Sequence, residues 1–425
     1  NGSENFTPKN RYGFFPSVGL GWVISNESFF EPLTNVIQYL KVRGTWGQVG
    51  NSQISGRRFA YLATVTDSSS TSYTFGKNMD QNYGTTAIDE YAVDVTWEVA
   101  DKTDIGVDMR LLNNKLNLQF DYFKESREGI YLRRSSIPSY VGMINNPYGN
   151  IGKVENKGFE LSVNYANSWG GDWSLSLMGN YSFNRNKVLE DDSTVVYPWQ
   201  NTIGNKVGQR FGLVALGLFE SYGEIAASPV QTGDTRPGDI KYKDINGDGK
   251  IDEYDKVPIG WGSVPEIMYG FGFSVGWKNL SLTAMFQGAA HVDAMLSGEG
   301  VLPFSQGSSR GNLLSNITDR WTEENPRQNA FYPRLSIGNI NMNYEESTWW
   351  LKDTDYLRLK NIELSYRLPD HWMKRIHLDN ARIFIQGVNL LTFSSFKIWD
   401  VELGDGRGAR YPNIASVSLG VNFNF

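Results

Sequence analysis

The chain has 425 residues with 44 Gly, 22 Tyr, 23 Phe and 13 Trp, a mix that favours turns and aromatic-rich strands over packed helices. Its net charge of −6 arises from 40 basic and 46 acidic residues without a basic block, which excludes nucleic acid as a partner. The absence of cysteine excludes disulfides and thiolate chemistry, and no apolar run approaches the roughly 18 residues that a membrane-spanning helix needs.

Strands are marked along the chain by period-two alternation, in which one face is apolar and the other is small or polar. The alternation is clear at Leu116 to Tyr122, Phe159 to Tyr165, Trp173 to Phe183 and Ala415 to Phe425. In the last segment, Ala, Val, Leu and Phe share one face, whereas Ser, Gly and Asn share the other. We expect about eleven strands, centred near Tyr12, Leu40, Ile105, Leu118, Leu161, Leu175, Phe273, Leu282, Leu359, Phe384 and Leu419.

The connections between these strands come in two alternating sizes. Short turns are expected at Asn113-Asn114, Gly170-Gly171 and Lys278-Asn279. Between them lie long polar or Gly-rich stretches, roughly 49–94, 133–150, 187–262, 292–353 and 392–412. Outer-membrane barrels have this asymmetry, with short periplasmic turns and long extracellular loops, whereas a soluble β-sandwich shares only the alternation within single strands.

A strand count from the C-terminus gives a consistent topology. If the chain ends in the periplasm, every short turn also falls there, with longer periplasmic connections only at 26–38 and 368–380. The second of these is expected to contain a short helix around His371 and Trp372. The sequence therefore predicts an all-β fold, an antiparallel transmembrane β-barrel to which this chain contributes about 11 strands. Because an odd number cannot close such a barrel, about as many strands are expected upstream.

A calcium-loop pattern lies in the segment 237–260, within a predicted extracellular loop. Side-chain oxygens fall at loop positions 1, 3, 5, 9 and 12, and the position-7 ligand is a backbone carbonyl, so the candidate ligands are Asp244, Asn246, Asp248, Asp252, Asp255 and Lys250. Gly249 at position 6 lets the chain turn sharply, but Asp255 replaces the usual Glu. The flanks suggest extended chain at 238–243 and a turn at 257–260, not helices. We expect structural Ca²⁺, with Mg²⁺ less favoured; the alternative is an Asp/Asn/Gly-rich loop that only turns.

Catalytic constellations are missing from the sequence. His291, His371 and His377 are scattered, and neither a Gly-x-Ser-x-Gly elbow nor a Gly-x4-Gly-Lys-Ser/Thr phosphate loop occurs. We therefore do not expect an enzyme. Loop aromatics have the chemistry to stack on sugars or peptide side chains, but packing explains them as well, so no substrate-binding residue is assigned; they are Tyr148, Trp261, Trp349, Trp350 and Trp399.

Eight short motifs follow one another along nearly the whole chain. They are Arg11 to Ser17, Gly47 to Asn51, Thr96 to Glu98, Ile151 to Glu160, Pro237 to Lys250, Asp355 to Asn361, Gly387 to Leu390 and Val421 to Phe425. Together and in this order they resemble the C-terminal half of the barrel of SusC-like TonB-dependent transporters. Most of these residues are expected to be structural, such as Gly158 easing a loop-to-strand bend. The terminal Phe425 resembles the assembly signal that the barrel-insertion machinery reads.

The resemblance implies a 22-stranded barrel in the bacterial outer membrane, with residues 1–425 as its C-terminal part and with the plug and N-terminal strands outside this chain. It implies TonB-energised import of an oligosaccharide or peptide, and a SusD-like lipoprotein as lid. The lipid bilayer, the TonB complex and the rest of the transporter are the other partners it implies. Two alternatives remain open, a passive porin and a soluble glycan-binding β-protein.

Overall fold

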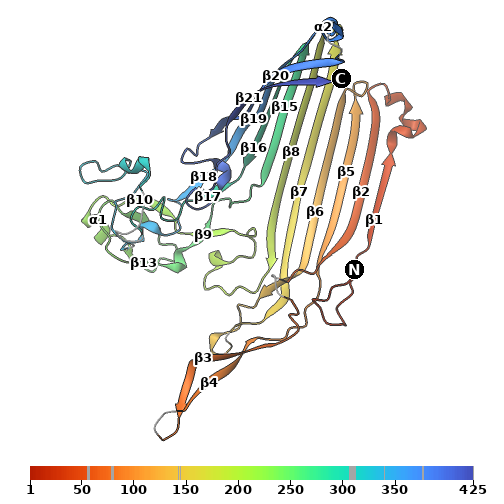
Figure 1. Ribbon diagram of the computed structural model, residues 1–425. Helices are drawn as coiled ribbons and strands as arrows, with labels where there is room; N and C mark the ends of the chain where they lie inside the picture. Colours follow the sequence, from red (N-terminus) through yellow and green to blue (C-terminus); the bar gives the residue numbers. More distant parts are fainter. Residues whose placement is uncertain are drawn as a thin grey trace.

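One antiparallel sheet of eleven strands dominates the computed structural model (Figure 1), which describes residues 1–425 except 55–57, 78–80, 142, 144, 306–312, 339, 376–377 and 425. Each strand pairs with the next in the order β1 (Ser17–Val23), β2 (Ile37–Asn51), β5 (Glu98–Leu111), β6 (Leu116–Arg133), β7 (Tyr148–Trp169), β8 (Trp173–Glu190), β15 (Ile267–Trp277), β16 (Leu280–Ala290), β19 (Tyr356–Arg367), β20 (Asn380–Ser394) and β21 (Ser416–Asn424). The all-β prediction and the number of strands in the sheet are confirmed.

The first strand was placed wrongly from the sequence. It was expected near Tyr12, but β1 begins at Ser17, and Tyr12 forms only an isolated bridge with Gly2. Pro16 has no N–H for a sheet ladder and directly precedes β1, so pairing with β2 starts after it. The other ten predicted centres fall inside strands of the sheet.

The two ends of the sheet differ as the connection lengths predicted. At one end, here the turn end, the tight turns contain Asn113, Asn114, Gly170 and Gly171, whose φ values of 57°, 63°, 58° and 77° place them in the left-handed region. The longer connections there hold the 3-10 turns η1 (Ile24–Asn26) and η2 (Ser28–Leu33), and the helix α2 (Asp370–Arg375), which lies beside the turns at the top of Figure 1.

The five long connections predicted from the sequence lie at the opposite end, here called the loop end, toward the left and bottom of Figure 1. The hairpin β3 (Thr64–Phe75) and β4 (Gln81–Glu90) projects from it. The smaller elements are β9 (Arg210–Gly212), β10 (Ala215–Leu218), α1 (Tyr222–Ala226), β11 (Val230–Gln231), β12 (Ile240–Tyr242), β13 (Lys250–Ile251), β14 (Val257–Ile259), β17 (Asp293–Met295) and β18 (Leu351–Asp353), with the 3-10 turns η3 (Ser139–Val141), η4 (Pro198–Gln200), η5 (Glu253–Asp255), η7 (Ser315–Thr318), η8 (Met342–Tyr344) and η9 (Val401–Leu403).

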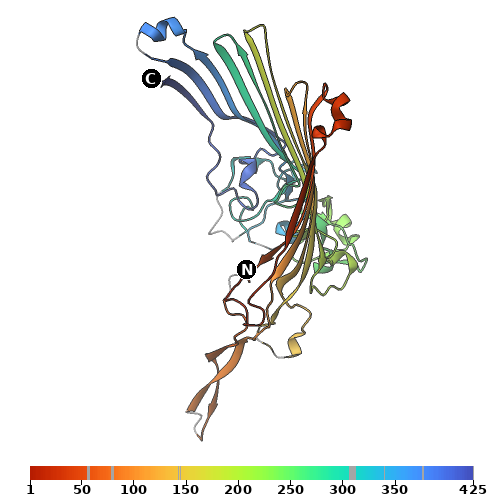
Figure 2. The same cartoon turned by 90° about the vertical axis from the view of Figure 1, so that its right-hand side faces the viewer.

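The sheet is curved and its strands are tilted (Figure 2). Its apolar face is exposed. Near the turn end, Trp169, Trp173 and Trp277 are neighbours in register on three strands and are 46%, 51% and 46% exposed. Toward the loop end, Phe159 stacks on Phe120. Phe159 and Trp169 are ten residues apart on β7, which at a rise of about 3.4 Å and a tilt of about 40° spans about 25 Å. This is the height of the lipid-facing band of an outer-membrane barrel, flanked by aromatic side chains.

No helix among the described residues has the length and apolar character required to cross a membrane.

Candidate functional site: the inner face and the loop subdomain

The inner face of the sheet, opposite the exposed apolar face, is polar. On β2, Arg43 Nη1 lies 3.0 Å from Asp104 Oδ1 and Arg43 Nε lies 3.5 Å from Asp108 Oδ2, both on β5. The same guanidinium pairs with Asp121 on β6. One cation thus bridges three strands of the wall, as expected for a face that lines a lumen instead of meeting lipid.

A cavity of about 670 Å³ lies on this inner face, toward the loop end. Its wall includes Glu160, Asn180, Ser182 and Gln287 on β7, β8 and β16, and Glu402 of η9 lines it from the loop side. Hydroxyl, amide and carboxylate groups therefore predominate among its polar groups, and no Lys or Arg of the described chain lines it. Its volume is within the range of ligand sites, about 300 to 1,000 Å³, and its polar groups suit a hydroxyl-rich or peptide ligand.

Arg358 fixes the position of η9 beside this cavity. Its side chain is 2% exposed, and Nη1 and Nη2 donate to Glu402 Oε2 at 2.6 Å and Asp400 Oδ1 at 2.8 Å. Nε donates to Thr392 Oγ1 at 3.1 Å, and the Tyr356 hydroxyl donates to Glu402 Oε1 at 3.0 Å. A buried guanidinium is stable only when its N–H donors have hydrogen-bond acceptors. This network therefore holds η9 against the inner face of the sheet.

Three long connections fold together into one loop subdomain with its own apolar core. They are the segments 191–266, 291–355 and 395–415, and the buried core includes Leu213, Leu218, Ile240, Tyr242, Trp321, Tyr332, Trp350 and Phe396. Trp350 Nε1 donates to Asn343 O at 2.6 Å, and the Tyr242 hydroxyl donates to Met342 O at 2.9 Å. Burial raises the pKa of the Tyr242 phenol, so it stays a neutral donor. These connections are therefore a folded unit.

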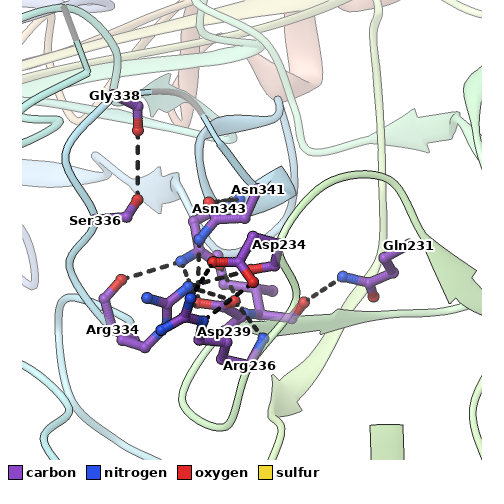
Figure 3. A network of polar contacts seen from close by, with 10 residues as sticks. Gln231, Asp234, Arg236, Asp239, Arg334, Ser336, Gly338, Asn341 and Asn343 are labelled. Atoms are coloured by element: carbon purple, nitrogen blue, oxygen red, sulfur yellow. Dashed lines mark hydrogen bonds and ion pairs between the residues drawn. The ribbon is translucent and has the colours of Figure 1, made fainter. Parts of the chain in front are cut away.

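Asp239 is the polar centre of this loop subdomain (Figure 3). Its carboxylate is 1% exposed and pairs with Arg334 through two bonds of 2.9 Å. The side-chain amides of Asn341 and Asn343 donate to it at 3.2 and 2.9 Å, and the Arg236 N–H donates at 2.8 Å. Five donors therefore satisfy one buried carboxylate, joining β12 to the segment 334–343.

A second buried carboxylate, Glu266, joins the loop subdomain to the sheet. It pairs with Arg185 of β8 at 2.7 Å and with Lys206 at 3.2 Å, and His291 Nδ1 lies 3.1 Å away. The ring of Trp261 stacks on His291 with centroids 4.0 Å apart. Burial alone would raise the pKa of Glu266, but hydrogen bonds from Arg185, His291 and Lys206 hold that pKa below its usual value.

The predicted calcium loop begins as a tight turn between β12 and β13 and ends in η5. Gly247 and Gly249 have φ values of 76° and 81°, and their N–H groups donate to Asp244 at 2.7 and 2.9 Å. Asp255 is fully buried and accepts from the N–H groups of Ile245 at 2.7 Å and of Asp252 at 2.9 Å. In the part of the chain that the structure describes, no group of three or more Asp, Glu, His or Cys side chains is placed to hold a metal ion. Calcium binding stays a prediction.

The flanks of this loop are only partly as expected. The extended chain before it is confirmed as β12, but the turn expected at 257–260 is mostly the short strand β14, which pairs with β9. Burial of Ile259 against the loop core explains this difference, because it gives the strand an apolar anchor. Only Gly260, with a φ of 65°, has a turn conformation.

Residues 1–390 match the model of the family described as TonB dependent receptor-like, beta-barrel. The chain belongs to this family of TonB-dependent receptor barrels. Over its full length it is 29% identical to TonB-dependent receptor P3 of Formosa agariphila and 27% identical to TonB-dependent receptor SusC of Bacteroides thetaiotaomicron, of which it covers 43% and 41%.

Solved structures show the same fold. The RagAB peptide importer in its closed-closed state superposes with a TM-score of 0.73 at 22% identity, over all of this chain and 45% of that one. In its open-open state the TM-score is 0.74 at 21% identity, over 99% and 44%. This TonB-dependent receptor barrel thus spans less than half the length of its relatives, and it is an outer-membrane protein.

Several structural residues of this receptor barrel were not singled out from the sequence. Asp239 and Arg358 lie within two of the eight motifs, but the pairing of each is made by segments distant in the chain. Gly158 was expected at a loop-to-strand bend, whereas it lies inside β7, where a Cβ would come within 2.0 Å of Phe183 O. Its role is therefore close approach of the neighbouring strand.

The loop aromatics have mixed positions in the receptor barrel. Trp350 is buried in the loop core, Tyr148 stacks on Tyr131 at 4.9 Å, and Trp261 is 42% exposed despite its contact with His291. Two predicted features, the assembly signal Phe425 and His377, lie outside the described residues.

Proposed function

We propose that this chain forms part of the wall of an active importer in the outer membrane, which takes up a bulky nutrient with energy supplied through TonB. The observation that carries the proposal is the family match over residues 1–390. The nutrient is an oligosaccharide or a peptide, and the hydroxyl, amide and carboxylate groups in the inner cavity of about 670 Å³ support either. One solved relative is named a peptide importer. The plug and the TonB contact would come from parts of the transporter outside this chain.

A SusD-like surface lipoprotein is the proposed lid of this importer. The loop subdomain supports this, because barrel closure does not require three loops that share a core. It presents exposed apolar side chains such as Tyr222, Val230 and Ile337, which are 67%, 68% and 66% exposed. Apolar and aromatic side chains of this kind contribute favourable binding free energy when a partner protein buries them. The loop subdomain would then face the cell exterior, and the turn end the periplasm.

Affinity purification from native outer membranes tests this function. A stoichiometric lipoprotein should copurify in mild detergent, with a contact that buries more than roughly 2,000 Å², as permanent complexes do. Nutrient uptake should stop when the proton gradient is collapsed. If the barrel is recovered only with its own polypeptides and uptake continues, the passive porin becomes the better explanation. The family match and the exposed apolar band argue against the alternative of a soluble glycan-binding β-protein.

We also propose that the loop from Asp244 to Asp255 binds Ca²⁺ in a structural role. Its oxygen-bearing residues have the spacing of a calcium loop, and Gly249 at position 6 has the left-handed conformation that this turn needs. The buried carboxylate of Asp255 at position 12 lies in the same loop. A bound cation would hold β12 and η5 together from the solvent side.

A further inference from the structure

A recess of about 570 Å³ in the loop subdomain contains a lysine, Lys352, that has no carboxylate partner among the described residues. The recess is formed by two connections, 291–355 and 395–415. Its apolar walls are Leu314, Phe331, Phe396 and Ile398, and its cationic groups are Lys352 of β18 and Lys397. We call it the Lys352 recess. It is separate from the inner cavity, since the two share no lining residue.

Lys352 is the half-buried cation of this recess. Its Nζ donates to Trp349 O at 2.7 Å and lies 5.3 Å from the centre of the Phe331 ring. Among the described residues, no carboxylate lies within ion-pair distance of it. Partial burial lowers the pKa of Lys352, because it removes part of the water around the ammonium.

The surroundings of the recess are cationic overall. Lys397 is exposed at the rim, and the carboxylate of Asp353 already accepts the N–H of Asp355 at 2.7 Å. An ammonium that has three donors and a single acceptor can still bind a ligand oxygen. The Phe331 and Phe396 side chains beside it would favour an apolar group next to that oxygen.

We propose that the Lys352 recess binds a carboxylate carried on an apolar body, as part of the imported nutrient. The ammonium of Lys352 pairs with the carboxylate, and Phe331, Phe396 and Ile398 cover the apolar part. The C-terminal residue of a peptide has this chemistry, and a uronate shares the carboxylate but has a polar ring. The inference rests on the proposed function only for the origin of the ligand, because binding needs neither TonB nor a lid.

Calorimetry on the purified full-length receptor, without the lipoprotein, tests the site with three probes. N-acetylphenylalanine supplies the carboxylate and an apolar ring, N-acetylphenylalaninamide is its neutral counterpart, and digalacturonate is the uronate. N-acetylphenylalanine should bind at least tenfold more tightly than the amide. Binding of digalacturonate but not of N-acetylphenylalanine would show that the recess takes an acidic sugar, which overturns the apolar part of the proposed ligand. Equal binding of the acid and the amide, or no binding of either acid, overturns the proposal.

Variants connect the binding to Lys352 itself. Lys352→Met should weaken carboxylate binding at least tenfold, and Lys352→Arg should restore part of it, because the charge is retained. Lys241→Met is the matched control, since Lys241 lies in the same loop subdomain and is paired with Glu224 at 2.5 Å. Unchanged binding in folded Lys352→Met overturns the proposal.

Amine footprinting makes the test independent of how the variants fold. Acetylation of wild-type Lys352, followed by mass spectrometry, should slow at least threefold when N-acetylphenylalanine is added, whereas Lys241 should not change. Equal labelling of Lys352 with and without the probe overturns the ligand site. Protection of Lys352 by the lipoprotein alone also overturns it, because the recess would then be a protein interface. Neither result affects the lid purification test, so the two proposals fail separately.

Discussion

Arg43 on β2 and Asp121 on β6 form an ion pair that crosses the strand between them, β5. Gly106 of β5 lies in register with both residues. A Cβ at Gly106 would come within 2.4 Å of both Arg43 Cζ and Asp121 Oδ1. Glycine therefore leaves the space through which the pair forms.

Gly106→Val should separate this pair and lower the thermal stability of the folded barrel. We expect a cost of about 2 kcal/mol, below that of a fully buried pair because the Arg43 side chain is 23% exposed. Heat-modified migration on a gel measures the effect. Gly44→Val is the control, since a Cβ there has only one neighbouring atom, at 3.9 Å, and faces away from the pair. If both variants melt alike, the crossing pair has no special role.

The final strand allows the assignment of its two faces to be tested. Leu419 is 77% exposed on the apolar face of β21, and Ser418 points to the other face. Leu419→Arg should cost about 2 to 4 kcal/mol if it lies near the bilayer midplane, and Ser418→Arg far less. The yield of assembled barrel after refolding into lipid vesicles measures both. Equal losses would contradict the assignment.

Asp239→Ala should unfold the loop subdomain locally while the sheet persists. Removal of this buried carboxylate leaves the half-buried Arg334 without its partner, at a cost of about 3 kcal/mol. Hydrogen exchange should become fast in 334–343 and stay slow in β6 and β7. The exposed Asp234, which pairs with Arg236 at 2.7 Å, provides the control Asp234→Ala, which should have little effect.

Replacing Asp244 and Asp248 by Ala tests the proposed calcium loop. The double variant should lose calcium binding measured by calorimetry and should loosen the loop without disrupting the barrel, because the loop lies outside the sheet. Glu253→Ala, an exposed acid of the same segment outside the ligand pattern, should bind as the wild type does. If the wild-type protein binds no calcium, the calcium proposal fails and the segment is only a turn.

The attachment of the loop subdomain through Glu266 should depend on pH. The pKa of Glu266 is lower in the folded state, so its contribution is fully present above the unfolded value of about 4.3 and is lost as the pH falls through the folded value. Proteolysis of the segment 191–266 should therefore accelerate below about pH 4. Glu266→Gln should lose this acid response. A wild type whose loops are equally protected at pH 3 and pH 7 would show that the ion pairs are not needed.

Much of the wall was determined by local sequence. Alternation over residues such as Phe159 to Tyr165 fixes which face meets lipid, because a strand places successive side chains on opposite sides. The turns at Asn113 and Gly170 are equally local, since few residues adopt positive φ without strain. Strand count and connection lengths follow from these two signals.

Pairings between distant segments were decided only by the tertiary structure. Asp239 meets Arg334 across 95 positions, and Arg358 meets Glu402 across 44, and no periodicity in either segment signals such contacts. The Lys352 recess exists only because two loops converge on one lysine. The sequence by itself thus determined the amphipathic strands and their order, because these depend on side-chain alternation and turn chemistry. The folded loop subdomain required the tertiary structure, because buried charges are matched by whichever loops the sheet brings together.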